Sequence, residues 1–473
     1  MSDYPKHGWD SEEGVDEPVL PGQFNARVQG QWASSQPKIR RNNQWIPIAE
    51  ATIPPSEPPE GLDGGFSWDQ TSTDTDWLYD ADAAGNLNVE TVTTLDYSGT
   101  GSVTEAVSNA AGDPTVIVFE VGGQIQIGGD RFQIDTPNLW FAGETAPWPG
   151  ITFSEGRVRT REPNLIFSHI SFISGDRGVS EAKTNFTAED PDTMVDHCTF
   201  ALSASSNLSW HGGTDRASVI NCIIAEGLYR HTFHDQARSR GLLDLMDDQA
   251  GAENQDFTHL GCIYAHHVRR MPLMRAHCCM ANNYIYNYGH NVDGYTGSGS
   301  GGNIVVSPSG PSGQTTNPEI TWQSCVYEPG DSTPSGYSRE IFSFDAQLYH
   351  DDIEWDDENR PLTDNNQTIL AEPPTVPAGL DLENDLVPAS GVIDYVKANS
   401  GPRPADRPDY EYELVNSRLQ TGSGVIDEVS DLENAGWTTP WDYTGTSHSL
   451  NVPSTDIIDW IKTNYTAVVE GTA

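Results

Sequence analysis

Short apolar runs separated by turn-forming residues recur along the middle of this chain, and they constrain its fold more than any other feature. Between Pro114 and Tyr327 they include Val116-Ile-Val-Phe119, Leu165-Ile-Phe167 and Val219-Ile-Asn-Cys-Ile-Ile224. Glycine (44) and proline (31) punctuate the sequence throughout. A helical bundle needs long amphipathic runs without these two residues, so the pattern excludes a bundle and favours an all-β fold.

Five of the runs align on a small residue followed by two larger ones. They are Cys198-Thr-Phe200, Cys222-Ile-Ile224, Cys262-Ile-Tyr264, Asn283-Tyr-Ile285 and Cys325-Val-Tyr327. The first anchors lie 24 and then 40 residues apart, which suits one coil of a parallel β-solenoid plus a variable loop. The alignment predicts that four cysteines stack in one buried column as small core residues. A redox or metal role for the cysteines is disfavoured, because their spacing matches no metal-binding finger.

One amphipathic helix is expected before the solenoid, over residues 102 to 110. Ser102 and Glu105 have the spacing of a capping box, and the apolar residues from Val103 to Ala110 fall on one face. Gly112 is expected to end it. Such a helix would cap the open N-terminal end of the solenoid, where an exposed sheet edge would otherwise aggregate.

Three segments are expected along the chain. Residues 1–60 contain two strand pairs between 23 and 53 and a Pro-rich linker, and they form a small β module that is either a docking segment or a decoration of the next domain. Residues 61–330 form the solenoid. Residues 331–473 are acidic and Pro-rich, and we expect long arms packed on the solenoid with two short helices, near Ser390 to Asn399 and Ser454 to Asn464.

The charge balance is strongly acidic, with 69 Asp and Glu against 25 Lys and Arg and a net charge of -44. Only five of the basic residues are lysine. Such a surface tolerates high salt better than low salt, so we expect a halophilic source. The same charge disfavours nucleic acid as a partner. No apolar stretch approaches the ~18 residues of a membrane span, and no secretory signal is recognisable after Met1.

Basic residues gather in one window of this acidic chain. They are Arg230, Arg238, Arg240, Arg269, Arg270 and Arg275, six in 46 positions where an even spread gives about two. Arginine grips carboxylates, sulfates and phosphates bidentately, so the cluster indicates an anionic ligand. The alternative is internal pairing with nearby acids such as Asp235, Asp244, Asp247 and Asp248.

Several motifs, in order from about Thr94 to Trp437, resemble the pectate lyase family of polysaccharide lyases. They are Gly101-Ser-Val-Thr-Glu-Ala-Val107, Ile117-Val-Phe-Glu-Val-Gly-Gly123, Phe141-Ala-Gly-Glu144, Asp196-His-Cys-Thr-Phe200, Ala225-Glu-Gly-Leu228, Arg240-Gly-Leu-Leu243, Asn282-Asn-Tyr-Ile-Tyr-Asn287, Gly401-Pro-Arg-Pro-Ala-Asp-Arg407 and Thr421-Gly-Ser-Gly-Val-Ile-Asp427. The resemblance implies a right-handed, single-stranded parallel β-helix with an N-terminal capping helix.

The segment Arg270-Met-Pro-Leu-Met-Arg275 is similar to the family's Arg-x-Pro-x-x-Arg motif. By this resemblance Arg270 is the base that takes the C5 proton of a uronate, and Arg275 binds the uronate carboxylate. Arg240 stands where the family has a substrate-binding lysine. Arg238 and Arg269, beside these residues, are further candidates for substrate binding.

The resemblance also implies calcium, which bridges substrate carboxylates to protein acids and stabilises the enolate-like intermediate. Here Ser205 and Ser206 stand where the family supplies a pair of acids. The upstream acid that the family has after Ser174-Gly-Asp176 is also not cleanly present, and Glu189, Asp190 and Asp192 are the candidate substitutes as metal ligands. The arginines of the family's site are therefore present, whereas acids of its calcium site are replaced.

Two functions are open from the sequence. The first is a lyase or related glycan-cleaving enzyme acting on an acidic surface or extracellular polysaccharide, with Arg270 as base. The second is a catalytically silent virion surface or receptor-binding protein, such as a tail spike of a haloarchaeal tailed virus, that recognises a host surface glycan. The second places the protein extracellularly or on a virion, with residues 1–60 as the attachment to a larger assembly.

Overall fold

The computed structural model describes residues 24–28, 31–35, 38–41, 44–47, 68–129, 131–177, 184–211, 213–229, 239–244, 256–289, 304–306, 318–333, 341–343, 346–355, 361–363, 367–421, 426–441 and 443–471. They belong to two compact units, Met1–Glu60 and Gly61–Ala473. The basic residues Arg230 and Arg238 and the acids Asp235, Asp247 and Asp248 lie outside the described residues.

The first unit contains two antiparallel hairpins, as its alternating sequence predicts. Strand β1 (Phe24–Val28) pairs with β2 (Gln31–Ser35), and β3 (Lys38–Arg41) pairs with β4 (Gln44–Pro47). The pair of hairpins is thus confirmed. Its docking role stays a prediction.

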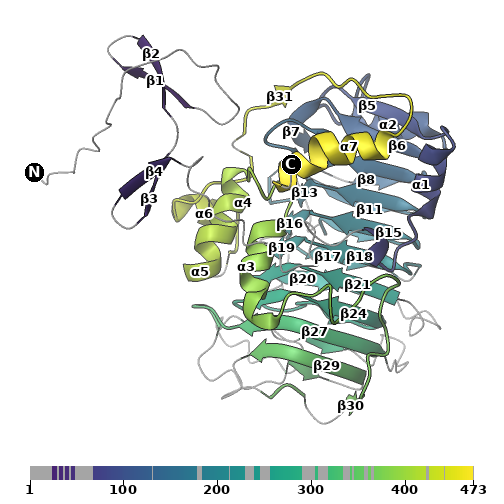
Figure 1. Ribbon diagram of the computed structural model, residues 1–473, viewed down its shortest axis with the longest axis vertical. Coiled ribbons are helices and arrows are strands. Elements are labelled where there is room, and N and C mark those ends of the chain that lie inside the picture. Colours follow the sequence, from purple (N-terminus) through teal and green to yellow (C-terminus); the bar gives the residue numbers. More distant parts are fainter. Residues whose placement is uncertain are drawn as a thin grey trace, which may run out of the picture. The chain divides into compact units, whose positions relative to one another are not determined.

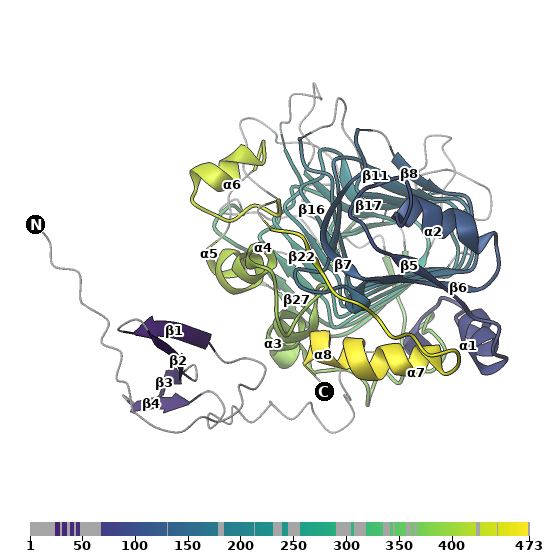
Figure 2. The same ribbon diagram turned by 90° about the horizontal axis from the view of Figure 1, so that it is seen from above.

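The second unit is a parallel β-helix in which most coils contribute three strands (Figures 1 and 2). The first strands of the coils are β6 (Thr115–Phe119), β9 (Leu139–Ala142), β12 (Leu165–Ser168), β15 (Thr193–Asp196), β18 (Ala217–Ile220), β21 (Asp256–Leu260) and β24 (His277–Ala281). The second strands are β7 (Val121–Gln126), β10 (Ile151–Ser154), β13 (Ile170–Ile173), β16 (Thr199–Ala201), β19 (Ile223–Ala225), β22 (Ile263–Ala265) and β25 (Tyr284–Tyr286). The third strands are β8 (Arg131–Ile134), β11 (Arg157–Thr160), β14 (Phe186–Ala188), β17 (Ser206–Trp210), β20 (Arg240–Leu243), β23 (Leu273–Met274), β26 (Ile304–Val306) and β28 (Phe342–Ser343).

First and second strands belong to one sheet of 19 strands, and the third strands form a separate sheet of eight. The pairings between successive coils are parallel and in register, which stacks equivalent side chains inside the helix. Phe172 and Phe200, for example, stack with ring centroids 5.0 Å apart and planes 5° from parallel. The predicted parallel β-helix is confirmed.

The predicted column of small residues is also present. Ile223 is paired with Ile263, Ile263 with Tyr284, and Tyr284 with Val326. The residues before them, Cys222, Cys262, Asn283 and Cys325, therefore stack, and Cys198 continues the column through the pairing of Thr199 with Ile223. All four cysteines are fully buried and are thiols rather than members of disulfide bonds.

The β-helix does not end near residue 330, as the acidic composition after that point suggested. Strand β27 (Glu319–Glu328) pairs along most of its length with β29 (Ala346–Trp355), and β29 pairs with β30 (Gln367–Ile369). The prediction missed β29 because the strand is exposed along one side and carries Asp351, Asp352 and Glu354. Those acids interrupt the apolar pattern without breaking the backbone pairing.

The capping helix α2 (Val103–Ala110) is confirmed. It contacts β5 (Asn88–Val92) and β6 at the N-terminal end of the β-helix (Figure 2). Ser102 Oγ accepts the Glu105 N–H, and the Glu105 carboxylate accepts the Gly101 N–H at 2.6 Å. The left-handed C-cap is Ala111 (φ 53°), one residue before the glycine expected to end the helix. A second N-terminal helix, α1 (Asp76–Ala83), was not predicted.

The C-terminal segment folds back along the coils and contains more helix than the sequence predicted. Its helical segments are α3 (Ala389–Asn399), α4 (Asp409–Glu413) with the π-helical turn Leu414–Arg418, α5 (Leu419–Thr421), α6 (Ser430–Asn434), α7 (Ile457–Ile461) with the π-helical turn Lys462–Thr466, and α8 (Ala467–Glu470). The first predicted helix matches α3, and the second matches α7 and the turn after it. Within the described part of the chain, no helix combines the length and apolarity needed to cross a membrane.

This segment docks on a column of left-handed turns between the first and second strands of successive coils. The turn residues are His169, His197, Asn221, Gly261, Asn282, Ser324 and Asp352, with φ between 45° and 65°. Backbone and side-chain groups of these turns bond to the segment. Examples are Gly401 N–H to Asn221 O (2.8 Å), Ser400 Oγ to Gly261 O (2.8 Å) and Asn282 Nδ2 to Val387 O (2.6 Å). The C-terminal segment is therefore fixed by the turns of the 19-stranded sheet.

Candidate functional site

Three of the predicted arginines meet at one edge of the eight-stranded sheet. Arg240 begins β20, and its register partner on the preceding coil is Ser206, which begins β17. On the following coil Arg240 forms a parallel bridge with Arg269. Arg270 is the next residue, and it lies on the coil of β23, so Ser206, Arg240, Arg269 and Arg270 come together on three successive coils; β17 and β20, which carry the first two, are adjacent in Figure 1. We call these four residues the arginine edge.

Ser206 holds the Arg270 side chain directly. The Arg270 Nη1 group donates a hydrogen bond of 2.8 Å to Ser206 Oγ, and Ser206 is buried while Arg270 is half-buried. Hydrogen bonds to a charged group contribute about 1.5–3 kcal/mol, roughly twice a neutral pair. The bond therefore fixes the position of the Nη1 end of the Arg270 guanidinium.

The backbone of Arg270 is fixed as well. Its φ is 63°, in the left-handed region. The Arg270 carbonyl accepts the Leu242 N–H at 2.9 Å, and the Arg269 carbonyl accepts the Gly241 N–H at 3.1 Å. Close approach of the two coils requires a glycine here, because a Cβ on Gly241 would lie 2.3 Å from Arg270 O.

The other predicted residues of the basic window lie elsewhere. Arg275 follows β23, at the opposite end of that short strand from Arg270. Two described histidines of the window, His266 and His267, are buried structural residues: His266 Nδ1 lies 2.8 Å from Asn287 Nδ2, and His267 Nδ1 accepts the Gly227 N–H at 3.2 Å. Asp244, expected as an internal partner for arginine, instead faces His259 inside the β-helix.

The structure does not gather the three acids proposed as metal ligands. The carboxylate of Glu189 accepts hydrogen bonds from Arg159 Nε (2.6 Å) and Arg161 Nε (3.2 Å). Arg216 engages both oxygens of Asp192. Burial, together with the charges of neighbouring Glu162 and Glu189, raises the pKa of Asp190.

Calcium does not fit the described residues at the family position. Calcium takes six to eight oxygen ligands, commonly carboxylates. Here Ser206 supplies a neutral hydroxyl that already accepts from Arg270, and Asp176 Oδ2 accepts the Val429 N–H at 2.8 Å. The positive charge of Arg240, Arg269 and Arg270 at the same position further disfavours a bound cation there.

Among the described residues, two groups of three His, Cys, Asp or Glu side chains bring their ligand atoms within 4.8 Å of one another. They are His169, His197 and Glu470, and Asp244, His259 and Cys278. Sequence reasoning missed both groups. Their members come from separate coils or from the chain end, and only the stacking of coils joins them.

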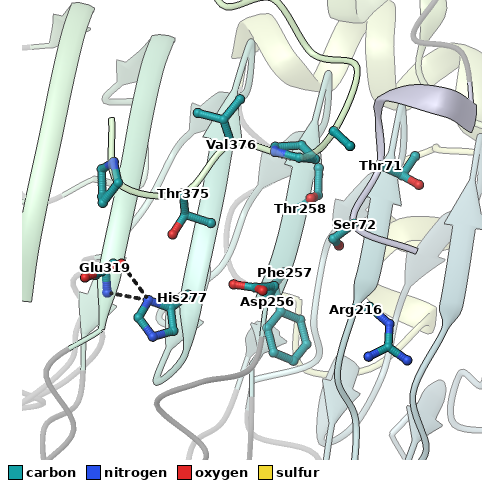
Figure 3. A pocket seen from close by; sticks show the side chains of 13 residues that line it. Thr71, Ser72, Arg216, Asp256, Phe257, Thr258, His277, Glu319, Thr375 and Val376 are labelled. Carbon is teal, nitrogen blue, oxygen red and sulfur yellow. Dashed lines mark hydrogen bonds and ion pairs between the residues drawn. The ribbon is translucent and has the colours of Figure 1, made fainter. Parts of the chain in front are cut away.

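A cavity of about 500 Å³ opens beside the 19-stranded sheet, away from the arginine edge (Figure 3). Its polar lining includes Arg216, Asp256, His277 and Glu319, and residues 374–378 form its other wall. His277 Nδ1 accepts the Glu319 N–H at 3.2 Å and lies 3.5 Å from Glu319 Oε2. Burial raises the pKa of Asp256, while the neighbouring His277 lowers it. The lining of mixed charge does not indicate an anionic ligand.

Comparison with curated proteins finds relatives of one kind. The chain is 30% identical over 248 residues to "Probable pectate lyase C" of Aspergillus fumigatus, covering 50% of this chain and 54% of that protein. The protein of the same description from Aspergillus oryzae is 28% identical over 235 residues, covering 49% and 51%. The chain is a distant relative of the pectate lyases. It spans about half the length of the curated relatives it matches, and no family model matches it.

Solved pectate lyase structures also overlap with this chain. A pectate lyase bound to a hexasaccharide shares 12% identity with a TM-score of 0.41, over 67% of this chain and 92% of that chain. A pectate lyase from Bacillus sp. N165 in complex with trigalacturonate shares 13% identity with a TM-score of 0.43, over 66% and 93%.

Proposed function

We propose that this protein binds an acidic polysaccharide of the polygalacturonate class along the arginine edge and cleaves it by β-elimination. The observation that carries the proposal is the convergence of Arg240, Arg269 and Arg270 on adjacent coils of a chain with a net charge of -44. Guanidinium groups bind carboxylates bidentately. The names of the relatives, pectate lyases, support the same substrate class.

The elimination itself has a defined balance of bonds. The C5–H bond breaks as its proton passes to a base, its electron pair forms the C4–C5 double bond, and the C4–O bond breaks with the leaving oxygen taking a proton from solvent. Arg270 is our candidate for the base, held by Ser206. Arg240 and Arg269 supply positive charge beside it, which stabilises the negative charge that develops on the uronate carboxylate.

A second candidate function is binding without cleavage. One observation favours it: Ser205 and Ser206 replace the acids that hold calcium in the resembling family, and arginine is a poor base because it stays protonated far above neutral pH. On this account Arg270 is a ligand for a carboxylate only. The extracellular or virion-surface location inferred from the sequence, with attachment through residues 1–60, accompanies either function as a proposal.

One experiment separates the two functions. The full chain is incubated with polygalacturonate, with and without added calcium, and the ultraviolet absorbance of the unsaturated product is followed. Binding is measured in parallel by calorimetry. Arg270→Ala should abolish product, and Ser206→Ala should lower kcat/KM by about 10- to 100-fold, the loss of a hydrogen bond to a charged group.

Arg161→Ala is the matched control, because Arg161 is an exposed arginine next to the same sheet and Glu189 keeps Arg159 as a partner in its absence. It should leave both product and binding unchanged. Binding without product in the wild type would establish the second function. Neither binding nor product with any uronate polysaccharide would reject both.

A further inference from the structure

Three polar side chains, one from each of three successive coils, interrupt the apolar lumen of the β-helix. His259 on β21 lies in register between Val219 and Met280. Cys278 on β24 lies in register between Phe257 and Ile320. Asp244 directly follows β20, and its N–H donates to Leu273 O at 2.8 Å, which continues the register of that sheet. All three side chains are buried, in columns whose other members are apolar.

Three polar atoms of this group make no hydrogen bond within the described part of the chain: both carboxylate oxygens of Asp244 and Nε2 of His259. The Asp244 side chain is 1% exposed, and His259 is fully buried. Buried polar atoms without hydrogen bonds destabilise a fold, so a further ligand bound between Asp244 and His259 would be stabilising.

The geometry suits a small tetrahedral cation. Asp244 Oδ2 and His259 Nε2 lie 3.3 Å apart, and both lie within 4.8 Å of Cys278 Sγ. Ligand bonds of ~2.0 Å in a tetrahedral zinc site place neighbouring N and O ligands about 3.3 Å apart. The oxygen, nitrogen and sulfur donors are of the kinds that zinc accepts, whereas calcium and magnesium require oxygen.

The second nitrogen of His259 is already oriented. His259 Nδ1 lies 2.5 Å from the Tyr264 hydroxyl, on the next strand of the same coil. Metal-binding histidines almost always bond through their other ring nitrogen to a fixed neighbour, which sets the ring direction. Tyr264 is fully buried and directs His259 Nε2 toward Asp244.

The other converging group, His169, His197 and Glu470, differs on these points. His169 Nδ1 lies 2.7 Å from Pro402 O, and His169 faces Glu144 as well as Glu470. His197 Nδ1 lies 2.9 Å from Asp196 Oδ1. In that group the histidines face several carboxylates and there is no thiol, whereas in the lumen group one carboxylate makes no hydrogen bond to a described residue and a thiol lies beside it.

We propose that Asp244, His259 and Cys278 form a zinc-class metal site that joins three successive coils of the β-helix, with a fourth ligand position left to water. Thiolate is the form of cysteine that binds metal, so the Cys278 thiol releases its proton to solvent when the cation binds. The site is independent of polysaccharide recognition. Because Asp244 follows the strand that Arg240 begins, the metal would also stiffen the arginine edge.

Cobalt(II) tests the site directly, because a cobalt thiolate has a charge-transfer band that cobalt bound only to oxygen or nitrogen lacks. The full chain is unfolded with a chelator, refolded with Co²⁺ alone or Zn²⁺ alone, dialysed and assayed for bound metal. We expect a single tightly bound equivalent, tetrahedral cobalt bands and the thiolate band. Tyr264→Phe should weaken Co²⁺ binding by about 10- to 100-fold.

Cys278→Ser should lose the thiolate band, and Cys279→Ser is its matched control. Cys279 is the next residue on β24, equally buried, and belongs to a different apolar cluster outside the lumen. Cys279→Ser should therefore keep the band. Wild-type protein that refolds fully yet retains no metal would overturn the proposal. Bound cobalt without a thiolate band, or a band lost in Cys279→Ser and kept in Cys278→Ser, would also overturn it.

Discussion

The position of Arg270 depends on the glycine across from it, so Gly241→Ala tests the arginine edge without touching any arginine. The added Cβ would lie 2.3 Å from Arg270 O and 3.0 Å from the His267 ring, whereas real Cβ contacts essentially never fall below 3.0 Å. The Arg270 carbonyl must therefore move by at least about 0.7 Å, the difference between 3.0 and 2.3 Å. It cannot do so freely, because it accepts the Leu242 N–H.

A displacement of ~1 Å at a reacting group can reduce a rate about 100-fold. We therefore expect Gly241→Ala to lower kcat/KM on polygalacturonate by about 10- to 100-fold, or the affinity by a similar factor if the protein only binds. The overpacking should cost about 1–3 kcal/mol of unfolding free energy, measured by denaturant titration. The chain should stay folded, since its lumen is unchanged.

Gly128→Ala is the control, because nothing lies within 4 Å of a Cβ at that position. Its φ of 79° makes the substitution strained, so it reports the cost of replacing a glycine without displacing Arg270. It should lose stability but keep kcat/KM and affinity. A Gly241→Ala protein with wild-type kcat/KM and affinity would refute the view that Arg270 must be held where it is.

Three other predictions concern stability. Burial alone would lower the pKa of His169, but Glu144, Glu470 and Asp196 raise it to about 9. The stability that protonated His169 contributes to the fold is therefore complete below pH 6.5 and is lost as the pH rises through 9. The Tm should fall over that pH range, and His169→Gln should flatten the plot of Tm against pH. Glu226 and Arg418 form an ion pair of 2.7 Å with both side chains 0% exposed, so Glu226→Ala should cost about 3–5 kcal/mol in denaturant titrations. The exposed pair of Arg177 and Glu433 is the comparison, where Glu433→Ala should cost at most about 1 kcal/mol. Dialysis into low salt should lower the Tm, and a Tm independent of salt would contradict a halophilic source.

The sequence predicts the coil architecture well because the lumen imposes a local pattern. Cys222, Cys262 and Cys325 align by sequence alone, since each is followed by two residues of one strand. Strand β29 was missed because pairing at the end of a β-helix needs only backbone groups. The arginine edge could be predicted in part. The clustering in the sequence pointed to Arg240, Arg269 and Arg270, but it did not show that Arg275 lies at the opposite end of β23 from Arg270.

The lumen group could not be predicted, for a different reason. Asp244, His259 and Cys278 are 15 and 19 residues apart in the sequence, spacings that match no metal-binding motif. Each alone looks like an ordinary residue near a strand. Only the stacking of three successive coils shows that all three occupy columns whose other members are apolar.

If this acidic protein binds an acidic polymer, the distance over which each electrostatic interaction acts decides how fast the two associate. The net charge of -44 repels a polyuronate at long distance, whereas the arginine edge attracts it at contact. Salt separates the two effects, because the Debye length falls from ~30 Å at 0.01 M to ~3 Å at 1 M. At molar salt the repulsion is screened, while hydrogen-bonded contacts between guanidinium and carboxylate persist.

We therefore expect the association rate of an oligogalacturonate to rise with ionic strength, opposite to the fall seen when a cationic surface attracts an anion. Stopped-flow measurements from about 0.1 M to 2 M salt would show this, with a neutral oligosaccharide as the comparison and refolding controls at each salt concentration. A rate that falls with salt would mean that the local field of Arg240, Arg269 and Arg270 outweighs the acidic surface even at long range. The global charge would then have no part in selecting the ligand.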